Sequence, residues 1–190
     1  KGVAMLKEAG IEVVENVLKE ECDEVNQVFF KYIKTKIPYL FVKCGITLDG
    51  KIALSNGISK WITNSIAREK VQYYRNKFMG IMVGINTVLT DNPSLTARIE
   101  NGVNPFRIIV DPNLQIDENC KVVKNNEDGK TMIITSQKNL FTEDAENTEI
   151  QIKQKRLDEE NKVKFIFIDG KKFSFRKMLE EIGKAGIDSV

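Results

Sequence analysis

Residues 43–63 read KCGITLDGKIALSNGISKWIT, and this stretch predicts the end of a strand, two turns and the start of a helix. Just upstream, residues 38–45 are mostly apolar and β-favouring, which predicts a buried strand. Lys43 is costly to bury without a partner, and Asp49 follows in a Leu-Asp-Gly turn whose Gly50 can adopt a positive φ. These polar groups indicate a site, although a lysine that reaches solvent and an ordinary hairpin turn explain the same residues.

The second half of the stretch leads into a helix. Residues 55–57 predict another turn, and Thr63 or Asn64 can cap the helix that follows. Trp61, the only tryptophan of the chain, lies between this turn and the helix start. A tryptophan in such a place packs in a core more often than it serves as a platform for a ligand, so both interpretations stay open here.

Strands and helices alternate along the rest of the chain. Apolar residues at helical spacing predict helices over residues 1–9 and 18–33 and a final helix from Ser174, after which Ile187 begins a strand. Five further strands are expected, at Gly80–Gly84, Phe106–Asp111, Thr131–Thr135, Glu149–Ile152 and Val163–Ile168. The last of these is apolar on both faces, which is typical of a central strand. The alternation predicts an α/β fold with helices packed on a mostly parallel or mixed sheet, and no G-x-G-x-x-G follows a strand as in a Rossmann fold.

Composition excludes several classes of site. The 190 residues contain no histidine, which removes the usual zinc sites and the Ser-His-Asp arrangement, and we expect no metal. A net charge of +2 gives no reason to expect nucleic acid or an anionic membrane as a partner, and no stretch predicts a membrane span. Three scattered cysteines are typical of reduced intracellular thiols, so a cytoplasmic location is expected.

The stretch from 43 to 63 closely resembles the signature of the reductase domain in the bifunctional riboflavin-biosynthesis deaminase/reductase family. That signature runs K-x-x-x-S/T-L-D-G-K/R and continues through G-x-S-x-W-I-T. Further blocks match in the same order: Tyr74-Arg75, VGINTVL at 83–89, DNPSLTAR at 91–98 and PFRIIVD at 105–111. The H-x-E and P-C-x-x-C patterns of the family's zinc deaminase half do not occur in the chain.

The resemblance implies a dihydrofolate-reductase-like fold with a mixed, mostly parallel sheet flanked by helices. It implies that residues 1–36 are the end of a deaminase domain with a helical linker, and that residues 37–190 are an incomplete reductase domain. Both ends of the chain interrupt an expected element. We therefore expect these residues to belong to a longer enzyme, to be inactive alone, to expose a sheet edge and to self-associate.

The implied activity is NADPH-dependent reduction of 5-amino-6-(5-phosphoribosylamino)uracil to 5-amino-6-(5-phosphoribitylamino)uracil. This phosphorylated ribosylaminopyrimidine is the expected small-molecule partner. Lys43 and Asp49 are the candidate catalytic residues. The resemblance assigns substrate binding to Ser59, Arg75, Leu95 and Arg98, and cofactor binding to Gly45, Trp61, Thr87 and Asp91.

Other interpretations remain for these residues. Arg75 on a helix is often no more than an exposed cation. Pro112 stands where a hydroxyl residue is expected to contact the cofactor's 2′-phosphate. Proline has no side-chain donor, so the sequence gives less support to a preference for NADPH over NADH. The chain as a whole is also compatible with another reductase of the same fold, acting on a pterin or folate, or with a non-catalytic nucleotide-binding or dimerisation module.

Overall fold

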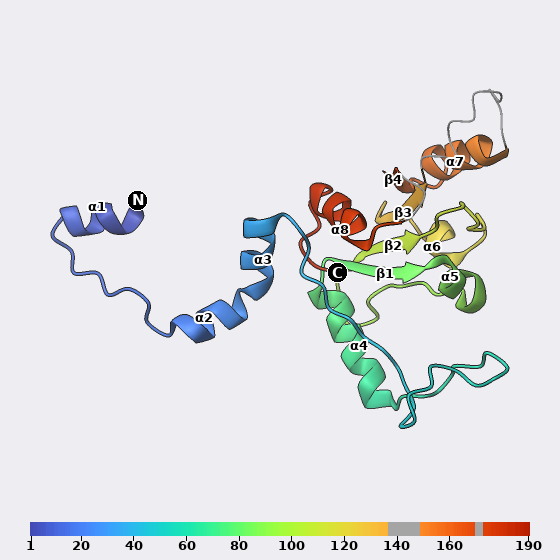
Figure 1. Ribbon diagram of the computed structural model, residues 1–190, viewed down its shortest axis with the longest axis horizontal. Coiled ribbons are helices and arrows are strands. Elements are labelled where there is room, and N and C mark those ends of the chain that lie inside the picture. The colour runs from blue at the N-terminus through green and yellow to red at the C-terminus, as the bar shows by residue number, and fades with distance from the viewer. Residues whose placement is uncertain (137–148, 170–172) are drawn as a thin grey trace.

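A four-stranded parallel sheet forms the centre of the protein in a computed structural model, which describes residues 1–136, 149–169 and 173–190 (Figure 1). The strands are β1 (Gly80–Gly84), β2 (Phe106–Val110), β3 (Thr131–Ser136) and β4 (Lys164–Ile168). They lie side by side in the order β1-β2-β3-β4, and every neighbouring pair is parallel. Four of the predicted strands are therefore confirmed at almost the predicted bounds.

Eight helices complete the described part of the chain. They are α1 (Gly2–Glu8), α2 (Lys19–Val25), α3 (Gln27–Thr35), α4 (Ser65–Lys77), α5 (Ile85–Asp91), α6 (Lys121–Lys124), α7 (Glu149–Glu159) and α8 (Phe175–Lys184). Two of them begin at residues expected from the sequence, and each of these residues caps its helix. The Oδ1 atom of Asn64 accepts a hydrogen bond from the Ala67 N–H at 2.9 Å, and Ser174 Oγ accepts one from the Lys177 N–H at 3.4 Å. None of the helices described is long and apolar enough to cross a membrane.

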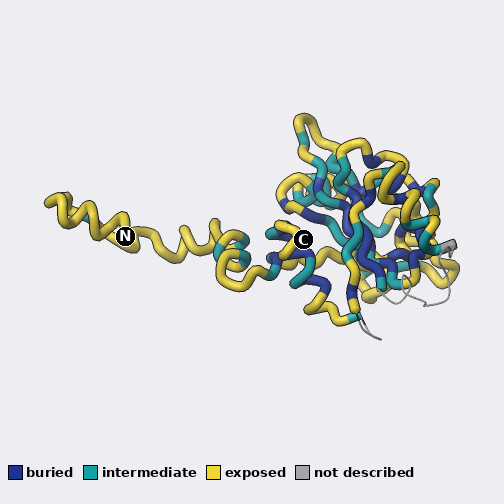
Figure 2. Tube along the Cα trace, turned by 90° about the horizontal axis from the view of Figure 1, so that it is seen from above, coloured by how far each residue is buried: buried dark blue, intermediate teal, exposed yellow. Residues whose placement is uncertain are grey.

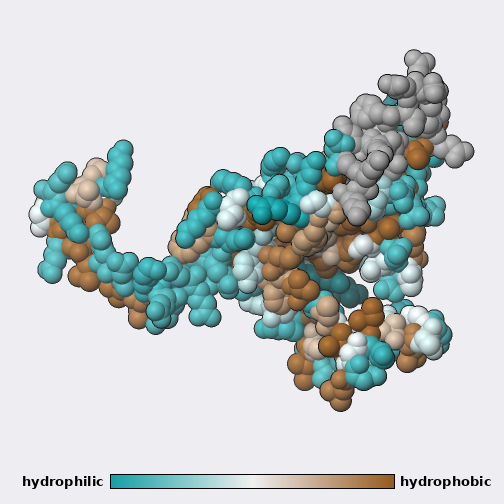
Figure 3. Space-filling model, viewed as in Figure 1, coloured by the Kyte–Doolittle hydropathy of each residue, from teal (hydrophilic) through white to brown (hydrophobic). Residues whose placement is uncertain are grey.

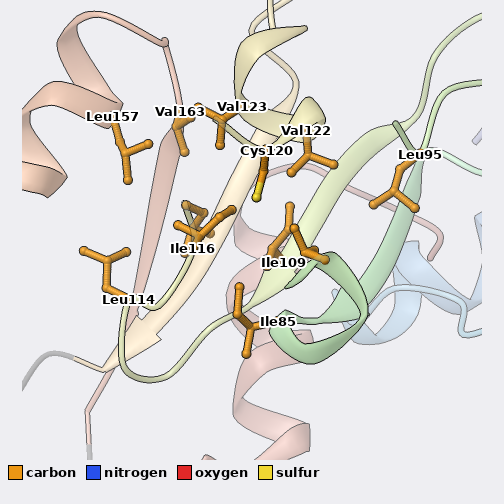
Figure 4. Packing of buried hydrophobic residues seen from close by; sticks show 12 residues of the cluster. Ile85, Leu95, Ile109, Leu114, Ile116, Cys120, Val122, Val123, Leu157 and Val163 are labelled. Carbon is orange, nitrogen blue, oxygen red and sulfur yellow. The ribbon is translucent and has the colours of Figure 1, made fainter. Parts of the chain in front are cut away.

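One face of the sheet packs against α5, α6 and α7. Ile109 and Ile133 point to this side because alternate residues of a strand share a face. They belong to one cluster with Val88 of α5, Val122 of α6 and Leu157 of α7, all of which are fully buried. Figure 4 shows Ile109, Val122 and Leu157 of this cluster. This cluster fixes the loops that follow β1 and β2.

The other face is covered by α8. Ile108 and Ile134 project to this side and pack with Met178 and Ile182 of the helix. After α8 the chain crosses to the far side of β1, where the Gly80 N–H donates a hydrogen bond to the Ser189 carbonyl at 2.9 Å. Residues 188–190 thus lie beside β1 in an extended conformation.

Two predictions about strands are corrected by the structure, one on the type of an element and one on the position of a strand in the sheet. Residues 149–152 begin helix α7 and are not a strand, because their apolar positions continue at helical spacing to the buried Leu157. The strand at 163–168 is an edge strand of the four-stranded sheet rather than a central one, and Phe167 remains 36% exposed. Its residues are apolar because helices cover both faces of the sheet at this strand, and not because the strand has a neighbouring strand on each side.

The segment at 38–45 is extended but is not the buried strand that its composition predicts. It pairs with residues 188–190 through a bridge between Tyr39 and Ser189, and Val42 is 72% exposed. The Phe41 ring packs against α4, with its centroid 4.5 Å from that of Tyr74. The segment has a pairing partner on one side, which leaves its other side open.

The N-terminal helices extend away from the sheet (Figures 1 and 2). The predicted single helix over 18–33 is broken at Asn26 into α2 and α3, and the side chain of Asn26 donates to the Cys22 carbonyl at 2.8 Å. No residue before Pro38 is buried. The Tyr32 hydroxyl joins this segment to the body by donating to the Gly183 carbonyl of α8 at 2.9 Å.

A buried ionic network joins the amino ends of β2 and β3. Arg107 is 1% exposed and forms an ion pair with Asp128. Its guanidinium also donates to Asn126 at 2.8 Å and to Thr131 at 3.0 Å. Hydrogen bonding from Arg107 lowers the pKa of the Asp128 carboxyl below its usual value. The network explains why a strand can carry a charged side chain in the core.

Candidate functional site

A cavity of about 700 Å³ lies beside β1, between α4, α5 and residues 40–43. Its volume is in the range of small-molecule and cofactor sites. Most of its wall is apolar, from residues such as Phe41, Tyr74 and Met82. Five residues assigned to the site from the sequence also line it: Lys43, Arg75, Thr87, Asp91 and Leu95.

Arg75 is held in this wall with part of its hydrogen-bonding capacity unused. Its Nη1 atom donates to the Thr96 carbonyl at 3.0 Å, while its Nε atom is buried without a partner in the part of the chain that the structure describes. Burial, and secondarily the positive charge of Arg98, lowers the pKa of the Arg75 guanidinium. Two neighbouring cations and an unpaired buried donor form an arrangement that an oxyanion would stabilise.

The loop that carries Leu95 and Arg98 is fixed at several points. Asn92 ends α5 in the left-handed conformation, and its Oδ1 accepts a hydrogen bond from the Lys121 N–H at 2.8 Å. Leu95 also has a positive φ, of 53°, and its side chain is only 3% exposed in the core. A left-handed leucine costs about 1–2 kcal/mol, so packing of its side chain holds this turn in place.

The cofactor candidates Thr87 and Asp91 lie on α5 four residues apart, and so on one face of that helix. Lys43 enters the cavity wall from the extended segment on the other side. A Cβ atom placed on Gly45 would lie 3.7 Å from both Lys43 Nζ and Thr63, so Gly45 is close to Lys43 although it does not line the cavity. Polar groups from three elements thus surround one apolar space.

Asp49, Ser59 and Trp61 do not line the cavity. They belong to residues 44–63, where the chain turns back on itself twice and projects away from the sheet (Figure 1). Together with the start of α4, this segment shows a largely apolar surface (Figure 3). The Asp49 carboxylate accepts a hydrogen bond from the Thr47 hydroxyl within its own turn. Trp61 is 74% exposed, and the Arg68 guanidinium lies 4.5 Å from its ring centroid.

Sequence reasoning missed Gln72, which supports the site from α4. Its side-chain oxygen accepts a hydrogen bond from the backbone N–H of Arg98 at 3.0 Å. The available signal was its position three residues before Arg75, since residues three apart share a helix face. Asn104, also missed, fixes the same loop by accepting a hydrogen bond from the Ala97 N–H at 3.1 Å.

The model of the RibD C-terminal domain family matches residues 38–190, which include the whole sheet and every cavity residue named above. The chain belongs to this family. It is 40% identical over 190 residues to the riboflavin biosynthesis protein RibD of Actinobacillus pleuropneumoniae, a match that covers 100% of this chain and 48% of that protein. The RibD of Aquifex aeolicus is 40% identical over 153 residues, covering 80% of this chain and 43% of that protein. The chain therefore spans about half the length of the curated relatives it matches.

Solved structures agree with this assignment. A diaminohydroxyphosphoribosylaminopyrimidine deaminase/5-amino-6-(5-phosphoribosylamino)uracil reductase from Thermotoga maritima superposes with a TM-score of 0.78 at 34% identity, covering 100% of this chain and 48% of that one. The riboflavin biosynthesis reductase Rib7 of Saccharomyces cerevisiae shares the fold alone, with a TM-score of 0.57 at 18% identity, covering 88% of this chain and 70% of that one. The dihydrofolate-reductase-like α/β fold implied by the sequence is confirmed.

Proposed function

We propose that this protein reduces 5-amino-6-(5-phosphoribosylamino)uracil to its ribitylamino product in riboflavin biosynthesis, with NADPH as the reductant. Family membership supports the reaction class, since the Thermotoga maritima protein of the same fold is named as a reductase of this compound. The cavity beside β1 is large enough for parts of two small ligands to meet in it.

The observation that carries the proposal is the buried Nε of Arg75, which has no partner among the residues that the structure describes, next to the charge of Arg98. Among the described residues, Nη1 is occupied by the Thr96 carbonyl and Nε has no acceptor, so we assign the edge formed by Nε and Nη2 to a second acceptor. That edge presents two parallel N–H donors, which match two oxygens of a phosphate. A phosphorylated substrate is the ligand that satisfies these groups.

The residues divide by their position around the cavity. Arg75 in the cavity wall and Arg98 beside it bind the substrate phosphate, and the turn at Leu95 shapes this end of the cavity. Ser59, which does not line the cavity, contributes to substrate binding from the 44–63 segment. Thr87 and Asp91 hold the cofactor from α5, with Gly45 and Trp61 contributing from the 44–63 segment. When bound, NADPH supplies a hydride for C1′ of the opened sugar.

Lys43 and Asp49 differ in how the structure supports a catalytic role. Lys43 lines the cavity and can stabilise negative charge on the sugar oxygen as the ring opens. Asp49 lies in a turn and reaches the cavity only if residues 44–63 close over it. Orientation of the two reactants accounts for most of the proposed catalysis, because bringing them together removes a large entropic barrier.

A pterin or folate reductase is less well supported. Such a site needs a buried carboxylate facing the ring, and the cavity's own carboxylate, Asp91, is exposed. Asp111 is fully buried, but its oxygens accept hydrogen bonds from the backbone N–H groups of Gln115 and Ile116 at 2.9 and 2.8 Å. This carboxylate serves the turn after β2.

The test is turnover by the purified protein, expressed from its complete open reading frame, with the ribosylaminouracil phosphate and with dihydrofolate as parallel substrates. We expect NADPH oxidation with the first compound alone. Oxidation with dihydrofolate instead would support the pterin reductase. NADPH binding without oxidation of either compound would support the non-catalytic module.

We further propose that residues 1–36 are the end of a deaminase domain with a linker and that residues 37–190 form the reductase part. The family match begins at residue 38, which supports this boundary. The protein acts in the cytoplasm, where its exposed Cys22 and Cys44 stay reduced. It self-associates, since segments 38–45 and 44–63 leave an open strand side and apolar side chains exposed.

A further inference from the structure

Two amides on α4 fasten the long loop between α5 and β2. Gln72 accepts a hydrogen bond from the Arg98 N–H at 3.0 Å, and Asn76, one turn later, accepts one from the Val103 N–H at 2.7 Å. Both bonds are made by side chains to backbone groups far away in the sequence. They therefore determine where this loop lies against the helix.

The two bonds differ in the residue whose backbone each one holds. Gln72 holds the backbone of Arg98 itself, whose charge acts on Arg75. Asn76 holds Val103, which lies in the part of the loop that leads to β2. The chain thus offers two similar bonds, of which one acts on a site residue.

The Gln72 bond opposes a repulsion. Arg75 and Arg98 are close enough for one cation to lower the pKa of the other, and burial of Arg75 strengthens this interaction. Without an anion, this repulsion favours movement of the exposed Arg98 away from α4. A bond from Gln72 to its backbone keeps that residue near Arg75 and leaves the guanidinium free to reach a ligand.

We propose that Gln72 is a positioning residue that holds Arg98 beside Arg75, so that the two arginines together bind the phosphate of a sugar phosphate. The inference rests on the proposed function, because it assigns the two arginines to the substrate phosphate. A neutral amide suits this role, since it accepts the Arg98 N–H bond without adding a negative charge that would compete with the phosphate. Gln72 does not touch the substrate and acts through Arg98.

The test compares Gln72→Met with Asn76→Leu, because each substitution keeps side-chain bulk and removes one hydrogen-bond acceptor. The dissociation constant of ribose 5-phosphate is measured by calorimetry for each variant, and hydrogen exchange of the Arg98 amide reports on the bond itself. Gln72→Met should accelerate that exchange and raise the dissociation constant of ribose 5-phosphate at least fivefold. Asn76→Leu should leave both quantities within twofold of wild type.

Steady-state kinetics supply a readout that a purely structural role would not move. In Gln72→Met the KM for the phosphorylated substrate should rise at least fivefold, with kcat and the KM for NADPH within twofold of wild type. The proposal is overturned if ribose 5-phosphate binding is unchanged in Gln72→Met, if Asn76→Leu weakens it equally, or if the Arg98 amide exchanges at the wild-type rate. If the proposed function is wrong, the result is different: the variants show the expected changes in ribose 5-phosphate binding, but the wild-type protein does not reduce the substrate.

Discussion

Replacing Arg75 by methionine tests the phosphate site most sharply. The substitution keeps an unbranched side chain of similar reach and removes both the charge and the planar fork. It also removes the Nη1 hydrogen bond to the Thr96 carbonyl, which spans 3.0 Å. Loss of that bond is offset in part by relief from burying a cation near Arg98. We therefore expect the free energy of unfolding to change by about 1 kcal/mol or less.

The effect on substrate should be much larger. A hydrogen bond to a charged group contributes about 1.5–3 kcal/mol, and 1.4 kcal/mol corresponds to a factor of ten. The KM for the phosphorylated substrate should therefore rise about 10- to 150-fold, while the KM for NADPH stays nearly constant. The assay is NADPH oxidation at varied concentrations of each reactant.

Lys77→Met is the matched control, because Lys77 is an exposed cation on the same helix that does not line the cavity beside β1. It should leave both KM values unchanged. The reasoning is refuted if Arg75→Met raises the substrate KM by less than twofold, which is about 0.4 kcal/mol. It is also refuted if Lys77→Met produces the same increase, since net charge would then explain the effect.

Three further outcomes follow from the structure. Lys43→Met should lower kcat roughly 100-fold with unchanged cooperative melting, and wild-type kcat would make Lys43 an ordinary solvent-exposed lysine. Asp128→Asn should cost about 3 kcal/mol at neutral pH, because it leaves the buried Arg107 charge without its partner. Because the pKa of Asp128 is lowered in the folded protein, its contribution to the free energy of unfolding is present above the ordinary aspartate pKa and is lost as pH falls through the lowered value. The stability of Asp128→Asn should therefore fall less than that of the wild type when the pH is lowered. Parallel curves of stability against pH for the two proteins would contradict this. Gly183→Ala should destabilise the protein by about 1–3 kcal/mol, since its Cβ would lie 2.0 Å from the Lys36 carbonyl oxygen, and unchanged denaturant midpoints would show that this approach is not tight.

The parallel sheet was predictable because its strands are short apolar runs bounded by turns. The interior apolar residues of β2 and β3 are buried on both faces, which is the pattern that a parallel sheet requires. Residues 149–152 were predicted wrongly because four residues with alternating polarity fit a strand and the first turn of a helix equally well. The helical spacing becomes clear only when the interpretation includes Leu157, which lies seven residues after Ile150 and so on the same helix face.

Burial was harder to predict than element type. The segment at 38–45 has the composition of a core strand, yet Val42 is exposed because the segment is paired on one side only. Composition does not reveal how many neighbours a strand has. In the same way, the exposed helices before Pro38 carry apolar faces that their own sequence cannot assign to a partner.

The candidate site was predictable from motifs rather than from chemistry. In the sequence, Arg75 is indistinguishable from an exposed helix cation. Its Nε is buried because the tertiary fold brings the loop with the Thr96 carbonyl against α4. Gln72 gave no sequence signal beyond its spacing from Arg75, since its partner Arg98 lies 26 positions away. Contacts across such separations depend on the tertiary fold.

Transfer of deuterium is the most direct measurement of the proposed reduction. The purified protein, expressed from its complete open reading frame, is mixed with the ribosylaminouracil phosphate and with NADPH that carries deuterium at both hydrogen positions of C4 of the nicotinamide. We predict a ribitylamino product with one deuterium, located at C1′ of the former sugar, and a large decrease of this product in Arg75→Met. Absence of the labelled product, or a product whose C1′ carries no deuterium, would contradict the assignment of this protein as the reductase.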